Sequence, residues 1–301
     1  MDASERKSRV ALLSVVSNAI LVVGKVAIGV AIGSVSVISE AIHSGIDLIA
    51  AAIALFAVRR SGKPPDRDHP FGHGKIENVS GAIEAILILV AAAWIIREAV
   101  HKLVEPMPMG DPALGVVIML ASSAMNIYVS RRLFAVSRDT GSVALEADAW
   151  HLLTDVYTSA GVMAALAAVW AGRWIFPGID LNWIDPAAAL VVALLITRAA
   201  VRLTIAAGHD LLDGSLPRDE ESWIRLFIAT KMPPVREFHG LRTRKAGPLR
   251  IVEFHMLVDA GMTVEDSHRI TEEIKQAVRA RFEGAVVTIH VEPWHPPANP
   301  V

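Results

Sequence analysis

Six long apolar stretches fill the first two thirds of this chain. They lie near residues 10–32, 35–58, 79–100, 112–134, 143–170 and 186–206. A helix needs about 20 mostly apolar residues to cross a bilayer, and each stretch is of that order. The pattern predicts an all-α bundle of six transmembrane helices, in a domain of residues 1–209.

The pattern changes after about residue 210. It predicts an amphipathic helix, two strands joined by a turn at Ala246-Gly247-Pro248, a second helix and a last strand, over residues 217–232, 237–246, 249–259, 263–282 and 285–292. This α-β-β-α-β order predicts an α+β, ferredoxin-like cytoplasmic domain of residues 210–293 with an antiparallel sheet. We expect the proline-rich tail, 294–301, to be disordered.

Composition limits the chemistry that the chain can perform. Hydrophobic residues make up 53% of it and charged residues 20%, below the roughly 25% of soluble proteins. The 29 basic and 31 acidic residues nearly balance, which argues against nucleic acid as a partner. Because there is no cysteine, a metal site must use histidine, aspartate and glutamate.

Basic residues predict the orientation in the membrane. They gather before the first apolar stretch, after the second and fourth, and late in the sixth: Lys7, Arg9, Arg59, Arg60, Lys63, Arg67, Arg131, Arg132, Arg138, Arg198 and Arg202. By the positive-inside rule, both termini are cytoplasmic. We therefore expect a multi-pass protein of a bacterial inner membrane.

Two apolar stretches carry the same polar motif, acid-Ala-x-His-x-x-x-Asp. The second stretch contains His43 and Asp47, and the fifth contains His151 and Asp155. Residues four apart share one helix face, so each helix offers an imidazole and a carboxylate to the same point. Two nitrogen and two oxygen ligands suit tetrahedral Zn²⁺.

The cost of burying charge in a membrane distinguishes the paired motifs from the other polar residues in these stretches. A charge at bilayer depth costs at least ~2.5 kcal/mol, so hydrogen bonding between helices explains the paired motifs less well than metal or proton binding does. We interpret Glu40 and Asp148, one turn before each motif histidine, as supporting or capping groups. We interpret Asn18, Lys25 and Glu84 as packing or helix-pairing residues.

Two further histidine groups lie outside the apolar stretches. Asp66, His69 and His73 occupy a loop whose proline and glycines favour a turn, which brings the two rings together. In the last third, His290 and Glu292 alternate along a predicted strand and so share a face. The alternative for both groups is a set of solvated side chains that bind nothing.

The paired motifs, the six-span layout and the ferredoxin-like end resemble the cation diffusion facilitator family over about residues 8–293. The resemblance implies that His43, Asp47, His151 and Asp155 form the transport site. It also implies a homodimer in the lipid bilayer that exchanges metal ions for protons by alternating access. Histidine at position 43 implies a preference for zinc over cadmium, without excluding Cd²⁺, Co²⁺, Ni²⁺ or Fe²⁺.

The same resemblance implies two more metal sites. Asp66, His69 and His73 match a second site in the loop. The binuclear site of the family's cytoplasmic domain, which holds regulatory Zn²⁺, is matched by His239, His255, His268, His290 and Glu292. The best-matched relatives carry aspartate where this chain has Glu292, and the longer side chain changes the spacing of a bridged metal pair.

The sequence thus predicts an efflux transporter for a divalent transition metal, foremost Zn²⁺, driven by proton antiport, and not an enzyme. The ATP-binding pattern Gly-x-x-x-x-Gly-Lys is absent, which favours an ion gradient as the driving force. A metal-sensing membrane scaffold is one alternative, although a sensor has no need of the paired membrane motifs. A proton-uncoupled metal channel is the other. An intramembrane metallohydrolase is disfavoured, since two histidines and two aspartates leave zinc no open position for water.

Overall fold

The computed structural model describes residues 3–32, 35–105, 113–175, 183–231 and 234–295. The side chains of some helical residues, His43 among them, lie outside that description, as does the tail from residue 296 that was predicted to be disordered. Contacts divide the chain into two compact units, Met1–Gly208 and His209–Val301.

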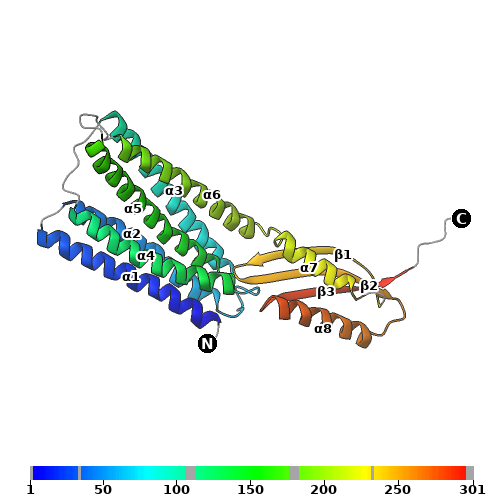
Figure 1. Cartoon of the computed structure of the whole chain (residues 1–301). Helices are drawn as coiled ribbons and strands as arrows, with labels where there is room; N and C mark the ends of the chain where they lie inside the picture. Colours follow the sequence, from blue (N-terminus) through cyan, green and yellow to red (C-terminus); the bar gives the residue numbers. More distant parts are fainter. Residues whose placement is uncertain (1–2, 33–34, 106–112, 176–182, 232–233, 296–301) are drawn as a thin grey trace. The chain divides into compact units, whose positions relative to one another are not determined.

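Six long helices lie side by side in the N-terminal unit (Figure 1). They are α1 (Ala3–Ile32), α2 (Val35–Ser61), α3 (Lys75–Val104), α4 (Ala113–Thr140), α5 (Val143–Ile175) and α6 (Ile184–Leu211). Each coincides with a predicted apolar stretch, so a helical membrane domain is confirmed. Within the described residues, segments of α1, α3 and α6 are long and apolar enough to cross a bilayer. The crossing of all six helices stays a prediction.

Small side chains let these helices approach one another closely. The interior between α1, α2, α4 and α5 combines fully buried alanines with a few larger residues: Ala11, Ala57, Val58, Val129, Leu133, Ala144, Leu145, Ala149 and Leu152. Lipid tails are as apolar as leucine, so membrane helices associate mainly through such tight contacts and through polar pairs. Close packing here is what brings the polar motif residues of α2 and α5 within reach of each other.

A buried carboxylate ties four segments of this unit together. Glu77, near the start of α3, is 0% exposed, and its Oε1 accepts hydrogen bonds from Lys7 Nζ at 2.7 Å and Ser61 Oγ at 2.6 Å. Its Oε2 accepts a bond from Ser142 Oγ, just before α5. The ammonium neutralises the carboxylate and the hydroxyls satisfy its lone pairs, as a buried ion pair requires. The ends of α1, α2, α3 and α5 are thereby joined.

The C-terminal unit has the predicted order of elements. They are α7 (Arg218–Ala229), β1 (Val235–Ala246), β2 (Leu249–Asp259), α8 (Val264–Arg281) and β3 (Val286–Trp294), with strand order β1-β2-β3. Both helices bury apolar residues against one face of the sheet, including Ile224 and Ile228 of α7, Ile274 and Val278 of α8, and Val252, Phe254, Met256 and Val258 of β2. The α+β class is confirmed.

The prediction of a wholly antiparallel sheet was wrong. Strands β1 and β2 are antiparallel, but β2 and β3 are parallel. The reason lies in the connections: a two-residue turn at Gly247-Pro248 reverses the chain between β1 and β2, whereas α8 carries it back across the sheet before β3. Gly247 has the positive φ of 59° that this tight turn needs.

We expect Glu77→Ala to destabilise the folded protein strongly, because the Lys7 ammonium stays buried without its counter-charge. Breaking a buried pair from one side typically costs ~3–5 kcal/mol. Thermal unfolding of the purified protein in detergent, followed by circular dichroism, measures the change. The matched control is Asp139→Ala, which removes the exposed partner of Arg6 and should cost no more than ~1 kcal/mol. Equal losses in the two variants would contradict the role of Glu77.

Candidate metal centres

The first centre lies between α2 and α5. Asp47 of α2 and His151 and Asp155 of α5 place one ligand atom each within 4.8 Å of one another. His151 Nε2 is 3.1 Å from Asp47 Oδ1, and both side chains are buried. Two ligands of one tetrahedral zinc ion lie roughly 3.3 Å apart, given metal–ligand distances near 2.0–2.1 Å. The three groups therefore need little adjustment to hold one ion.

For His43, the fourth predicted ligand, the structure describes the position of the backbone alone. This residue lies on α2, one helical turn before Asp47, but its side chain is outside the described residues. The next residue, Ser44, accepts a hydrogen bond from Lys25 Nζ of α1 at 2.7 Å. Lys25 thus pairs α1 with α2 beside the motif, in keeping with its interpretation as a helix-pairing residue.

Two buried acids lie near this centre, one interpreted from the sequence as a supporting or capping group and the other as a packing residue. Glu84 on α3 and Asp148 on α5 are both 0% exposed, and each interacts electrostatically with His151. Asp148 does not cap α5, which begins at Val143. The sequence does place Asp148 on the face of His151, three residues away, but only helix packing brings Glu84 to that face.

The second centre is the loop between α2 and α3. His69 Nδ1 and His73 Nε2 each lie 3.3 Å from a different oxygen of Asp66, and the two rings are 4.5 Å apart. The Asp66 carboxylate accepts the backbone N–H of His69 at 2.7 Å, and this bond chiefly lowers the pKa of Asp66. His73 is 4% exposed, and neither ring nitrogen makes a hydrogen bond within the described residues. Buried, unsatisfied nitrogens beside an ionised carboxylate fit a metal ion.

The third centre is a row of histidines across the sheet. His239, His255 and His290 stand directly opposite one another on β1, β2 and β3, with ring centroids 4.9 and 5.0 Å apart. A β-bulge after His239, made possible by Gly240 with a φ of 63°, adds one residue to β1 and interrupts the pairing, which resumes at Arg242 and Glu253. The row lies on the sheet face opposite α7 and α8, because Phe254 and Met256, on either side of His255, belong to the core.

Glu292 binds this row together. Its Oε1 is 2.8 Å from His255 Nδ1 and its Oε2 is 3.0 Å from His239 Nε2, while His290 Nε2 lies 3.6 Å away. The hydrogen bonds from His239 and His255 lower the pKa of Glu292, so the carboxylate is ionised at neutral pH. One carboxylate shared by imidazoles is a donor set that fits Zn²⁺, and the longer side chain still reaches both rings.

His268 is not part of the row. It lies on α8, is exposed, and acts electrostatically on Glu272 of the same helix. Since α8 covers the opposite face of the sheet from the row, we found no contact between His268 and the other predicted ligands among the described residues. Within one chain, four of the five predicted residues come together.

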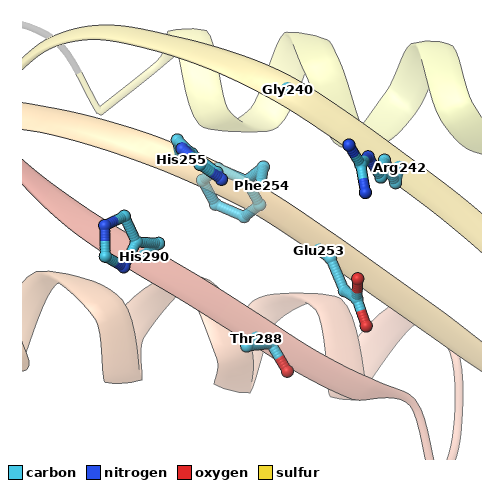
Figure 2. Close-up of a pocket in the computed structure, with 7 residues that line it drawn as sticks. All are labelled: Gly240, Arg242, Glu253, Phe254, His255, Thr288 and His290. Carbon is cyan, nitrogen blue, oxygen red and sulfur yellow. The ribbon is translucent and has the colours of Figure 1, made fainter.

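A pocket of about 170 Å³ adjoins the row on the same face. Figure 2 shows His255 and His290 at one end and Glu253 and Thr288 at the other, on neighbouring strands β2 and β3, with Arg242 on β1. Arg242 and Glu253 stand opposite each other in the strand register. The sheet face beyond the histidines is therefore polar and open enough to admit ions and water.

Comparison with known proteins matches both units. Residues 11–212 match the family model of the cation efflux transmembrane domain, and residues 216–294 match that of the cation efflux protein cytoplasmic domain. The cation-efflux pump FieF of Cronobacter sakazakii is 32% identical over 292 residues, which are 97% of this chain and 94% of the pump. An uncharacterised transporter of Synechocystis sp. is 36% identical over 268 residues, 89% of this chain and 84% of that protein.

Among solved structures, the metal-bound C-terminal domain of the CzcD transporter from Thermotoga maritima is 30% identical. The match covers 28% of this chain and 100% of that domain, with a TM-score of 0.25.

We expect Glu292→Gln to weaken zinc binding by the full-length protein at least ~10-fold at its cytoplasmic site, because the amide loses the charge that the imidazoles share. Competition with a chelating dye measures the affinity. Glu253→Gln is the matched control. Glu253 is a carboxylate on β2, on the same face of the sheet as the row but outside it, and its substitution should leave the zinc affinity unchanged. His268→Ala should cost less than Glu292→Gln. If Glu253→Gln weakens binding as much as Glu292→Gln, the assignment of Glu292 is wrong.

Proposed function

The chain belongs to the cation efflux family, as its resemblance to cation diffusion facilitators predicted, and on that premise we propose that it exports a divalent transition metal, foremost Zn²⁺, in exchange for protons. The observation that carries this proposal is the convergence of Asp47, His151 and Asp155 inside the helical unit. With His43, they offer two nitrogens and two oxygens, a set that suits zinc.

Transport follows from what the site needs in order to bind. A divalent ion requires neutral imidazoles and ionised carboxylates, so binding displaces protons and protonation displaces the ion. A proton shared between His151 and Asp47 stabilises the 3.1 Å contact between them. An entering cation replaces that proton as the neutralising charge. Access from alternate sides of the membrane then makes this replacement an exchange.

Several features support the wider arrangement that we propose. Basic residues at the ends of α1, α2 and α4 support cytoplasmic termini and six spans in an inner membrane. Residues 216–294 match a cytoplasmic dimerisation domain, which supports a homodimer. The row of His239, His255 and His290 with Glu292 supports a regulatory zinc site in that domain, separate from the cargo site.

A proton-uncoupled channel is the nearest rival. Both mechanisms use the same ligands, but a channel conducts whenever the ion gradient favours flow, whatever the proton gradient. A metal-sensing scaffold is less well supported, since it leaves the ligands buried between α2 and α5 without a role. The cargo could also be Cd²⁺, Co²⁺, Ni²⁺ or Fe²⁺, which share these ligand preferences in part.

We expect Asp155→Asn and Asp47→Asn each to reduce zinc uptake by proteoliposomes to the background of empty vesicles, because an amide supplies no charge to offset the ion. Uptake is followed with a zinc-sensitive dye trapped inside. Asp139→Asn, a substitution at an exposed position of α4, should transport normally. Near-normal uptake by either site variant would refute the assignment of the transport site.

We also expect an acidic vesicle interior to accelerate zinc uptake, because each entering ion exchanges with outgoing protons. Collapse of the pH gradient with a proton ionophore should slow uptake several-fold, and Asp155→Asn vesicles should show neither response. Uptake that is equally fast with and without the gradient would favour the channel.

A further inference from the structure

Most of the carboxylate oxygens of two buried acids beside the transport site, Glu84 and Asp148, lack hydrogen-bond partners among the described residues. Neither oxygen of Asp148 has one within the described residues, and nor does Oε2 of Glu84. Among the described residues, Glu84 accepts one side-chain hydrogen bond, from the hydroxyl of Ser80 on its own helix, 3.3 Å from Oε1. Both side chains are 0% exposed. Buried polar groups are nearly always paired, so three unsatisfied carboxylate oxygens call for a chemical explanation.

Polar groups on α1 and α5 are also unsatisfied within the described residues. The Ser14 hydroxyl of α1 lies near the Asp148 carboxylate and acts on it, but the contact between them does not have the geometry of a hydrogen bond. Asn18, one turn further along α1, leaves Nδ2 unpaired at 2% exposure. On α5, the Nδ1 of His151 is also buried and unpaired. Ser14 of α1 and His151 of α5, which both act on Asp148, thus carry unsatisfied groups of their own.

Glu77 provides a contrast on the same helix face, since seven residues, or two turns, separate it from Glu84. Glu77 is equally buried but has the Lys7 ammonium and two hydroxyls as partners. The charged groups that act on Glu84, among the described residues, are Asp148 and His151. The fold therefore neutralises the Glu77 carboxylate permanently, whereas it supplies no ammonium or guanidinium to Glu84 among the described residues.

The electrostatic balance around His151 is acidic. Glu84 from α3, Asp148 and Asp155 from α5, and Asp47 from α2 all act on this one imidazole or are acted on by it. Four carboxylates around a single histidine leave negative charge that a low-dielectric interior does not tolerate. A proton on the Glu84–Asp148 pair offsets part of it.

A metal ion is a poorer occupant of this pair than a proton. Among the described residues, Glu84 and Asp148 do not belong to any group of three metal-ligating side chains whose atoms converge within 4.8 Å. Within the part of the chain that the structure describes, which leaves out the His43 side chain, neither carboxylate hydrogen-bonds a predicted metal ligand. A proton needs only one oxygen, and two neighbouring carboxyl groups bind one readily because both cannot be ionised without repulsion.

We propose that Glu84 and Asp148 form a proton-binding site that is filled while Asp47, His151 and Asp155 hold no ion and that empties when a divalent cation binds there. The inference deepens the proposed exchange function and rests on it. The cation brings two positive charges close to the pair and favours the ionised carboxylates, so the proton leaves. The pair thereby adds a proton to the exchange beyond those carried by the metal ligands themselves.

Proton release during zinc titration tests the proposal. The full-length protein in detergent, in weak buffer with a pH-indicator dye, is titrated with zinc at neutral pH. The same titration of Asp155→Asn, subtracted, removes the protons released by the loop and cytoplasmic centres. Glu84→Gln and Asp148→Asn, each compared with its own Asp155→Asn double variant, should release about one proton fewer per ion bound at the transport site.

Asp139→Asn is the control, an exposed carboxylate of α4 that is ion-paired with Arg6, and its proton count should equal that of the parent. Either acid variant suffices for the test if the other fails to fold. Unchanged proton counts in a folded variant would overturn the proposal, because a purely structural role alters stability or affinity but not protons per bound ion. A parent that releases no more protons than Asp155→Asn would instead refute the proposed exchange itself.

Discussion

A charge buried between helices must be neutralised, and the interior of the N-terminal unit is organised by that requirement. Glu77 meets it permanently, with an ammonium and two hydroxyls fixed by the fold. Asp47, His151 and Asp155 meet it only in part, since one imidazole cannot balance two carboxylates. The first arrangement holds helices together whatever the ionic conditions. The second leaves a deficit of positive charge that an ion or protons must fill.

That difference links the architecture to the exchange of metal ions for protons that we propose. A site whose own side chains balanced their charge would gain little by binding a cation, and a site with no neutralising alternative would never release one. Protons provide the alternative, because they bind the same oxygens and nitrogens that hold the metal. Glu84, two turns beyond Glu77 and without its counter-charge, extends the deficit from α2 and α5 to a third helix, α3. Along α3, the ion-paired Glu77 therefore has a structural role, whereas we assign Glu84 to the proposed proton exchange.

The cytoplasmic unit solves a different problem, the precise spacing of ligands. Strand register fixes His239, His255 and His290 opposite one another, at the interval of hydrogen-bonded strands. Glu292, the next residue after His290 on the same face of β3, then reaches the rings of His239 and His255. Because β3 returns parallel to β2 after α8, its histidine meets His255 directly. A rigid sheet can hold a metal tightly, which suits a resident ion better than a cargo that must be released.

The sequence by itself determined the elements and the pairs of residues four apart. Apolar periodicity located six helices, and helical geometry alone places His151 and Asp155 on one face. Local chemistry also located the Gly247-Pro248 turn and hence the first strand pair. Tertiary structure decided the features that depend on contacts between distant segments. These are the parallel pairing of β3, the separation of His268 from the histidine row, and the burial of Glu84 near Asp148 and His151. Periodicity cannot show these, because it records which face of an element a residue occupies, whereas neutralisation and coordination depend on what the packed neighbour presents to that face.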